Sequence, residues 1–219
     1  MNIIIGADLV PTKSNIELFE KGDIDTLIGR ELTDIIRNAD YRIFNLEVPL
    51  VDECSPIKKC GPNLIAPTKC ISAYKAMGIE LLTLANNHIL DQGKKGLESS
   101  IKTLKEAGIS YVGVGNSIRE AHRPQIISCN GKRIGIYACV EHEFTVATGK
   151  ESGANPIDLL ETPDHIVKLK KPHPCGSQEW EILRVGADFR LKCLGCEHQV
   201  MVSRKLVEKN TRGLRKKGE

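Results

Sequence analysis

The chain has 219 residues, of which 41% are hydrophobic and 27% are charged, a composition typical of a soluble protein. This length allows one large domain, or one medium and one small domain. The net charge of +3 is too small to indicate a polyanionic partner for the whole chain, although Lys and Arg gather between positions 205 and 217.

The lack of a recognisable targeting pattern and the number of cysteines bear on the cellular compartment in which we expect the protein. No stretch approaches the roughly 20 apolar residues of a membrane span, and no signal-peptide pattern opens the chain. We therefore expect a cytoplasmic protein. In that compartment the eight cysteines are expected to be thiols or metal ligands rather than disulfides.

Two strands with a helix between them are predicted first. A β-branched run at 3–5 predicts a buried strand that delivers Asp8 at its carboxyl end, unless Asp8 only forms a turn. Apolar side chains recur at helical spacing over 24–39. A second strand over 41–47 ends in Asn45 and Glu47.

A polar turn that follows the next predicted strand contains most of the candidate site residues of the first part. The apolar run 81–84 predicts a buried strand, followed by Asn87, His88 and Asp91 before Gly93 releases the chain into a helix. Ligands of open α/β sheets bind outside the carboxyl ends of the strands, so we expect a site here. The alternative is that these residues are only loop and helix-cap residues.

The remaining elements of the first part complete an α/β pattern. The long loop at 51–68 is expected to be functional or to cover a site. Asn130-Gly131 predicts a hairpin, so the sheet is expected to be mixed. The segment Glu141-His142-Glu143 can supply a metal ligand or an ordinary hydrogen-bonded loop residue. Alternation of strands and helices predicts an α/β layered domain.

These motifs resemble the CapA family of capsule synthesis, a branch of the calcineurin-like metallophosphoesterases. The matching segments are Gly6-Ala7-Asp8, Phe44-Asn45-Leu46-Glu47, Ala85-Asn86-Asn87-His88-Ile89-Leu90-Asp91-Gln92-Gly93, Gly113-Val114-Gly115 and the segment 137–144. They fall in order over about residues 2–170.

The resemblance implies a fold, a metal site and a reaction class. The fold would be a sandwich of two sheets with helices outside. Asp8, Glu47 and Asn87 would bind a divalent metal (Mn, Zn or Fe), and His88, with Asp91 beside it, would act at the scissile bond of a phosphate ester or polyanionic substrate. The family role is poly-γ-glutamate capsule biosynthesis. Later His-Gly and His-x-His motifs of the family have no counterpart after Lys170, so we expect an incomplete domain over 1–162.

A second domain is predicted over 163–219, with the boundary near Pro163. Short alternating strands at 180–185, 188–192 and 200–202 predict a β-rich fold that ends in a basic helix from Arg204. The period of residues 166–170 fits either a helix start after Thr162 or a strand.

Three cysteines of this part predict a zinc site. Cys175, Cys193 and Cys196 give three thiolates, and zinc needs a fourth N or S donor, for which we favour His173 over His198. The alternatives are a redox C-x-x-C or buried thiols. A metal would help to stabilise so small a core.

The same part resembles a short stand-alone bacterial family of unknown function. Its marks are His173-Pro174-Cys175-Gly176-Ser177, Trp180-Glu181-Ile182, Arg184-Val185-Gly186-Ala187-Asp188 and Leu191-Lys192-Cys193-Leu194-Gly195-Cys196. The chain thus predicts a fusion of two families. As an alternative to the phosphoesterase function, the second domain would be a non-catalytic zinc module that binds a protein, or binds nucleic acid through its basic residues.

Overall fold

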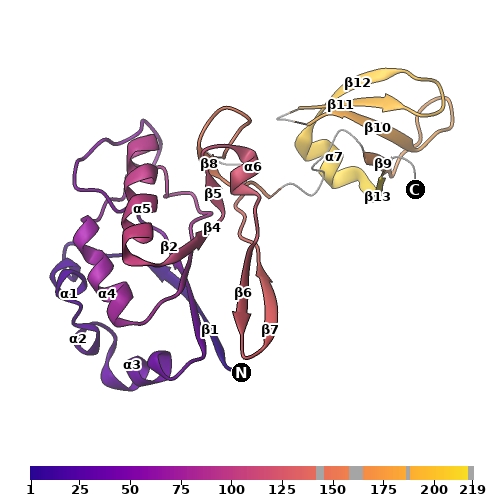
Figure 1. Ribbon diagram of the computed structural model, residues 1–219. Helices are drawn as coiled ribbons and strands as arrows, with labels where there is room; N and C mark the ends of the chain where they lie inside the picture. Colours follow the sequence, from indigo (N-terminus) through magenta and orange to yellow (C-terminus); the bar gives the residue numbers. More distant parts are fainter. Residues whose placement is uncertain (142–145, 158–164, 186–187, 217–219) are drawn as a thin grey trace. The chain divides into compact units, whose positions relative to one another are not determined.

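The structure is a computed structural model that describes residues 1–141, 146–157, 165–185 and 188–216 (Figure 1). The chain divides into two compact units, Met1–Ile157 and Asp158–Glu219. The boundary that we predicted near Pro163 lies outside the described residues. The two units are described separately.

A four-stranded parallel sheet is the centre of the first unit. Its strands follow one another in space as they do in sequence: β1 (Ile3–Leu9), β2 (Tyr41–Leu46), β3 (Leu81–Thr83) and β4 (Ser110–Val112). Because the strands are parallel, their carboxyl ends share one edge. The register aligns Asp8 with Asn45, and Asn45 with Thr83, at that edge.

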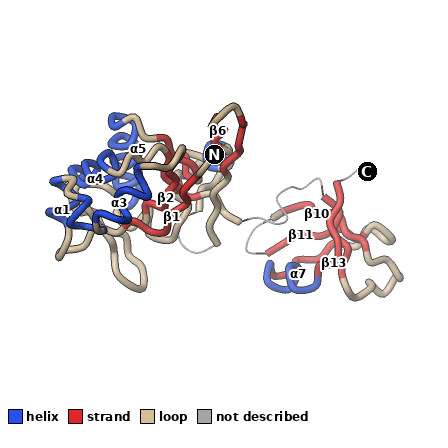
Figure 2. The backbone as a smooth tube through the Cα atoms, turned by 90° about the horizontal axis from the view of Figure 1, so that it is seen from below, coloured by secondary structure: helices blue, strands red, loops and turns tan. Residues whose placement is uncertain are grey.

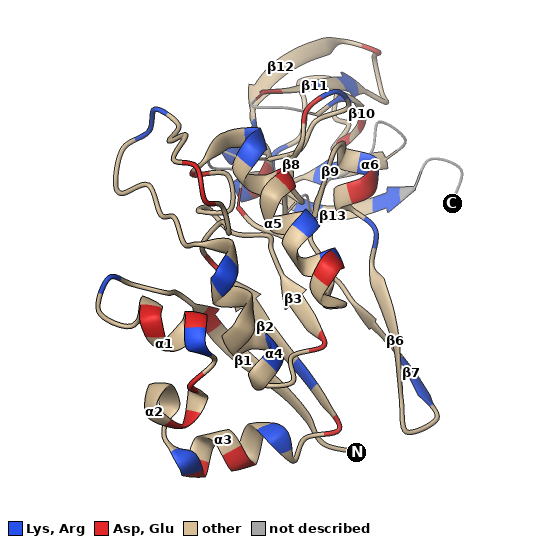
Figure 3. Cartoon of the chain, turned by 60° about the vertical axis from the view of Figure 1, so that its left-hand side comes forward, with Lys and Arg blue, Asp and Glu red and all other residues tan. Residues whose placement is uncertain are grey.

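Helices connect the strands and cover one face of the sheet (Figure 2). They are α1 (Ile16–Lys21), α2 (Ile24–Ile28), α3 (Arg30–Arg37), the short 3₁₀ helix η1 (Thr68–Cys70), α4 (Ile71–Ala76) and α5 (Gly93–Ala107). Lys and Glu four residues apart form ion pairs on α5, where Figure 3 shows acidic and basic bands interspersed.

Apolar side chains alternate between two cores, as the two-residue period of a strand requires. Phe44 and Leu82 belong to the large core under the helices. Ile43 and Leu81 point to the opposite face, where they pack with Ile127 of a hairpin. The inner strands β2 and β3 are therefore covered on both sides, as is usual for parallel strands, whereas Ile5 of the edge strand β1 is 76% exposed.

The hairpin consists of β6 (Gln125–Cys129) and β7 (Lys132–Ile136). Its turn residues Asn130 and Gly131 have φ of 47° and 75°, the values that a type I′ turn needs. Nearby lie β5 (Val114–Gly115), the short helix α6 (Ile118–Ala121) and β8 (Gly153–Ala154), with β8 paired antiparallel to β5.

Three expectations for this unit were wrong. The hairpin forms its own two-stranded sheet, so the four-stranded sheet is parallel and not mixed. In the described residues, the far face of the sheet therefore carries this hairpin instead of the second large sheet of a four-layer sandwich. The helix predicted over 24–39 is broken at Gly29, whose φ of 84° leaves the helical region.

The second unit is a five-stranded antiparallel sheet with one helix. The spatial order is β12 (Gln199–Ser203), β11 (Asp188–Cys193), β10 (Glu179–Arg184), β9 (His165–Leu169) and β13 (Thr211–Lys216), and α7 (Arg204–Asn210) precedes β13. Phe189, Leu191 and Val207 are among the residues of its core.

The structure settles one open question from the sequence analysis and corrects one expectation. The stretch with the ambiguous period is the strand β9. The basic helix from Arg204 ends at Asn210, which is earlier than we expected. Thr211 is already extended and begins β13, because the backbone there hydrogen-bonds along β9.

None of the helices in the described part of the chain has the length and apolarity needed to cross a bilayer.

The contact between β1 and β2 predicts a strict requirement for glycine at position 6. A Cβ on Gly6 would lie 2.0 Å from Cε1 of the buried Phe44 ring. We expect Gly6→Ala to destabilise the first unit by about 1–3 kcal/mol, since the ring must leave its place in a packed core. Urea denaturation measures the loss.

Gly149→Ala is the matched control, because a Cβ there meets no atom within 4 Å. Equal stability of the Gly6→Ala and Gly149→Ala variants would contradict the packing described for Phe44.

Candidate functional site

Asn45 connects two carboxylates at the carboxyl edge of the parallel sheet. Its Nδ2 donates to Oδ1 of Asp8 at 2.8 Å and to Oε2 of Glu47 at 2.8 Å. Its Oδ1 accepts a hydrogen bond from the Thr83 hydroxyl at 3.0 Å. Side chains from three neighbouring strand ends thus hydrogen-bond to one amide. Asp8 and Glu47 lie near each other because both accept from the same Nδ2.

Asn86 fixes the turn that follows β3. Its Nδ2 donates to the carbonyl of Leu46 at 2.8 Å, and its Oδ1 accepts from the backbone N–H groups of His88 and Ile89 at 3.1 and 2.8 Å. A buried amide that satisfies three backbone groups gives the turn one conformation. The direction of the His88 side chain follows from that turn.

His88 lies between two acidic side chains. Its Nδ1 is 2.7 Å from Oδ2 of the fully buried Asp91, and its Nε2 is 4.0 Å from Oε1 of Glu47. Because Asp91 is the acceptor, Nδ1 carries a proton and Nε2 faces the carboxylates of the sheet edge. Asp91 thus does more than cap a helix.

Lys59 is a member of this group that the sequence patterns did not identify. Its side chain is only 4% exposed, and its Nζ pairs with Oδ1 of Asp91 and lies 3.3 Å from Nδ1 of His88. The one available signal was the length of the loop at 51–68, which we expected to cover a site. That loop also supplies the backbone N–H of Leu64, which donates to Asp91.

The structure thus connects four of the five residues predicted for the first domain: Asp8, Glu47, His88 and Asp91. Asn87 is half-buried in the same turn, but makes no side-chain hydrogen bond with the described residues. His142, a further candidate, lies outside the described residues.

The electrostatics of this group make Glu47 hard to ionise. Burial raises the pKa of Glu47, and the negative charge of Asp8 raises it further. The hydrogen bond from Asn45 and the proximity of His88 offset part of this rise. The exposed Asp8 and the half-buried Glu47 are two neighbouring carboxylates that repel each other, and a nearby cation would relieve that repulsion.

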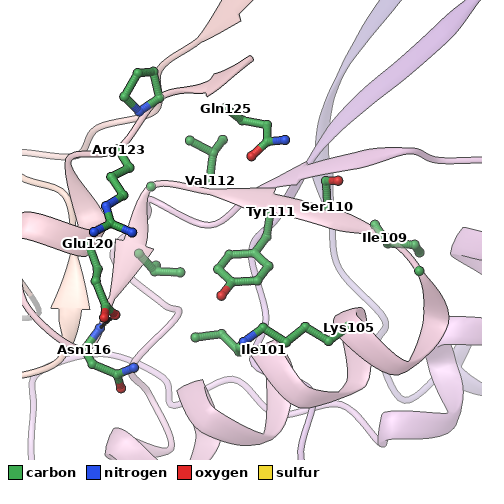
Figure 4. A pocket seen from close by; sticks show the side chains of 14 residues that line it. Ile101, Lys105, Ile109, Ser110, Tyr111, Val112, Asn116, Glu120, Arg123 and Gln125 are labelled. Carbon is green, nitrogen blue, oxygen red and sulfur yellow. Dashed lines mark hydrogen bonds between the residues drawn. The ribbon is translucent and has the colours of Figure 1, made fainter. Parts of the chain in front are cut away.

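A pocket of about 630 Å³ lies elsewhere, beside β4 (Figure 4). None of the predicted site residues lines it. Its polar groups already interact with one another: Lys105 Nζ lies 5.9 Å from the centre of the Tyr111 ring, and the backbone N–H of Asn116 donates to Glu120 at 2.9 Å. We therefore place the candidate site at the carboxyl edge of the sheet and not in this pocket.

A second group of side chains lies at one end of the second unit. The ligand atoms of His173, Cys175, Cys193 and Cys196 all lie within 4.8 Å of one another. Nδ1 of His173 is 3.2 Å from the sulfur of Cys175 and 3.4 Å from that of Cys196, and the sulfurs of Cys175 and Cys193 are 3.5 Å apart. These four residues can hold a metal ion.

The meander topology explains why residues so far apart in sequence meet. In an antiparallel sheet, the β9–β10 and β11–β12 connections fall at the same end. The backbone N–H of His173 donates to the carbonyl of Ser177 at 2.8 Å in the first loop, and that of Glu197 to the carbonyl of Cys193 at 2.9 Å in the second. Leu194 N–H donates to Glu179 carbonyl and links the loops.

A glycine makes the close approach of these loops possible. A Cβ on Gly195 would lie 2.8 Å from Cβ of Ser177 and 3.0 Å from the sulfur of Cys175. Burial raises the pKa of the Cys193 thiol, but hydrogen bonds from the backbone N–H groups of Gly195 and Cys196 and from the thiols of Cys175 and Cys196 together lower it to about 7.

His198 lies outside the four-residue group. Its ring stacks on that of His173, with 5.5 Å between the ring centres. The His173 ring also meets the edge of Trp180 at 5.0 Å.

Several basic side chains of this unit are paired. Arg215 contacts Glu179 at 2.9 Å, Lys192 contacts Glu197 at 2.9 Å, and Arg204 contacts Glu208 at 2.8 Å. These ion pairs reduce the positive charge on which the prediction of nucleic-acid binding depended.

Comparisons with known proteins agree with both resemblances. Residues 3–185 match the family described as bacterial capsule synthesis protein PGA_cap. Residues 162–214 match a family described as a bacterial protein of unknown function, DUF951, so the two matched ranges overlap.

Relatives of both kinds are similar to the chain. Capsule biosynthesis protein CapA of Bacillus anthracis is 32% identical over 153 residues, which are 66% of this chain and 36% of that protein. The uncharacterized protein YyzM of Bacillus subtilis is 54% identical over 44 residues, 20% of this chain and 65% of that protein. A probable polyglutamine synthesis accessory protein of Mycobacterium tuberculosis is 36% identical over 73 residues, 33% of this chain and 19% of that protein.

The chain therefore spans about a third of the length of CapA and just under two thirds of YyzM. The resemblances that the strand-end motifs and the cysteine segments predicted are confirmed. Since the first matched range covers most of the chain, the protein belongs to the bacterial capsule synthesis protein PGA_cap family.

Proposed function

We propose that the first unit is a metal-dependent phosphoesterase-type scaffold with a role in poly-γ-glutamate capsule biosynthesis. One observation carries this proposal: the His88 imidazole is held by Asp91 and faces Glu47, while Asn45 brings Asp8 against Glu47. The names of two relatives support the biological role, since they refer to capsule biosynthesis and to polyglutamine synthesis.

The donor types at the sheet edge suit a divalent metal. Asp8 and Glu47 offer carboxylate oxygens and Asn87 an amide oxygen, all hard donors that suit ions such as Mn²⁺, Zn²⁺ or Fe²⁺. The two carboxylates both accept a hydrogen bond from the Asn45 amide, which lies between them. When bound, the metal would polarise phosphoryl oxygens and lower the pKa of a water molecule.

His88 is proposed as the acid or electrostatic group of the site. Its Nδ1 proton is directed at Asp91, so Nε2 is the atom available to a substrate. In the protonated state, Nε2 can donate to a phosphoryl or leaving-group oxygen. Asp91 is proposed as the residue that orients the ring, and Lys59 as the counter-ion that allows Asp91 to be buried.

A phosphate ester is the substrate class that we propose. Its negative charge matches a metal held by carboxylates, and the His88 donor would lie beside a phosphoryl oxygen.

Removing a ligand and removing the acid group should have different effects. We expect Asp8→Asn to lower both bound metal and hydrolysis of an aryl phosphate ester, because a carboxylate donor is lost. We expect His88→Asn to retain the metal and to reduce hydrolysis by about 10²–10⁴-fold, the usual contribution of a positioned proton donor. Elemental analysis and steady-state hydrolysis measure these effects.

Asp34→Asn, on the exposed side of α3, is the control for a lost carboxylate. A correctly folded wild-type chain that neither binds metal at the sheet edge nor hydrolyses the ester would rule out the enzymatic proposal.

The raised pKa of Glu47 predicts a pH dependence of stability in chelator-treated protein. A carboxyl group with a higher pKa in the folded state binds more protons there than in the unfolded chain. Stability from Glu47 is therefore present below its usual pKa of 4.5 and is lost as the pH rises through the folded pKa. Glu47→Gln cannot ionise, so we expect it to gain stability relative to wild type as the pH rises through this window.

Denaturant midpoints of both proteins, measured at a series of pH values in EDTA, would reveal the divergence. Parallel curves for the two proteins would refute the repulsion between Glu47 and Asp8.

A further inference from the structure

We propose that His173, Cys175, Cys193 and Cys196 form a closed, structural zinc site that joins the two loops at one end of the second unit. This site is separate from the function proposed for the first unit and does not depend on it. Among the described residues, this is the one group of three or more His, Cys, Asp or Glu with this convergence of ligand atoms.

The donors have the chemistry of a zinc site. Three thiols and one imidazole make a Cys₃His set, which is a common structural combination for Zn²⁺. Mg²⁺ and Ca²⁺ prefer oxygen ligands and would be rejected by this set. Cys193 and His173 reach the group from inside the fold, since Cys193 is fully buried and the His173 ring meets the core residue Trp180.

The spacing of the donors is close to that around a tetrahedral ion. Zn–S bonds of about 2.3 Å place neighbouring sulfurs of a tetrahedron about 3.8 Å apart. The sulfurs of Cys175 and Cys193 are 3.5 Å apart, and both His173 distances to sulfur are 3.2–3.4 Å. These three distances need to lengthen by only a few tenths of an ångström around an ion, and all four ligand atoms lie within 4.8 Å of one another.

The backbone around the donors is held in position before any ion binds. Gly176 has a φ of 92°, which allows the first loop to turn directly after Cys175. Gly195 lets the second loop approach the first so closely that a Cβ at this position would collide with Ser177 and crowd the sulfur of Cys175. A C-x-x-C segment that acted only in thiol redox chemistry would need neither the close approach to Cys175 nor His173.

Four protein donors fill a tetrahedron and leave no open position, so the role is structural and not catalytic. The unit needs such support because it is small, and seven buried residues form its core, one of them Cys193 itself. The ion would join the β9–β10 connection to the β11–β12 connection and so fix the start of β10 against the end of β11.

The test uses the full chain, prepared under reducing conditions and freed of metal by a chelator. Co²⁺ replaces Zn²⁺ and shows thiolate-to-cobalt charge-transfer absorption only where sulfur is a ligand, so a metal held by Asp8 and Glu47 does not contribute. We expect this band to appear with one equivalent of Co²⁺ and to vanish when Zn²⁺ is added.

Trp180 provides a second readout. It is the only tryptophan of the chain, and its ring lies 5.0 Å from that of His173. We expect its fluorescence to change as Zn²⁺ binds, and its thermal unfolding transition to move to higher temperature, without any substitution that might unfold the unit.

Variants then assign the ligands. Cys175→Ser, Cys193→Ser, Cys196→Ser and His173→Ala are each expected to weaken or remove the band. Cys54→Ser, which removes an exposed thiol of the first unit, and His198→Ala are expected to leave it unchanged. Loss of the band in His198→Ala but not in His173→Ala would overturn the assignment of His173.

Two outcomes overturn the proposal as a whole. One is a reduced wild-type chain that binds neither Zn²⁺ nor Co²⁺ with a sulfur signature. The other is a chain whose Cys193 and Cys196 form a disulfide and are recovered without metal, which is the behaviour of a redox C-x-x-C. Either result would leave the proposal for the first unit unaffected, because Asp8→Asn tests that site separately.

Discussion

The carboxyl edge of the first unit depends on one amide, that of Asn45. Parallel strands bring Asp8 and Asn45 into register, and the Asn45 side chain then satisfies the acidic groups on either side of it. Without this donor, the half-buried Glu47 and the exposed Asp8 would repel each other without a hydrogen bond to compensate. The turn after β3 completes the arrangement, because Asn86 anchors it to the backbone of Leu46 and so directs His88 toward the same edge.

Sequence patterns were sufficient for the features that depend on local chemistry. The β-branched and apolar runs predicted the strands β1, β2 and β3, the Asn130-Gly131 pair predicted the hairpin, and the polar residues at the strand ends predicted four of the side chains that the structure connects. Sequence patterns failed where a contact with residues distant in the sequence, or a single glycine, determines the local structure. Gly29 breaks a helix that its periodicity favoured, and residues after Asn210 form a strand because β9 has a free edge for them. Lys59 was missed because nothing local in a long loop reveals that it reaches a buried aspartate.

The polar group around Asp91 in the first unit and the cysteine group in the second unit differ in how the cost of burying polar atoms is offset. In the first unit, Lys59 and Asp91 neutralise each other in an ion pair, and His88 hydrogen-bonds to the same carboxylate. In the second unit, thiols replace carboxylates. A thiol can be buried, as that of Cys193 is, and still provide a donor once it loses its proton. This difference explains why the second group tolerates a much smaller core around it.

The pairing of β9 with β13 determines how the second unit can be joined to other chains. These are its first and last strands, and His165 lies opposite Lys216 in their register. Entry and exit of the polypeptide are thus hydrogen-bonded neighbours. A module of this kind can be inserted into, or appended to, an unrelated protein without stretching its host, because both attachment points lie side by side. This geometry is compatible with the unit as a separate protein and with the unit attached to a larger domain.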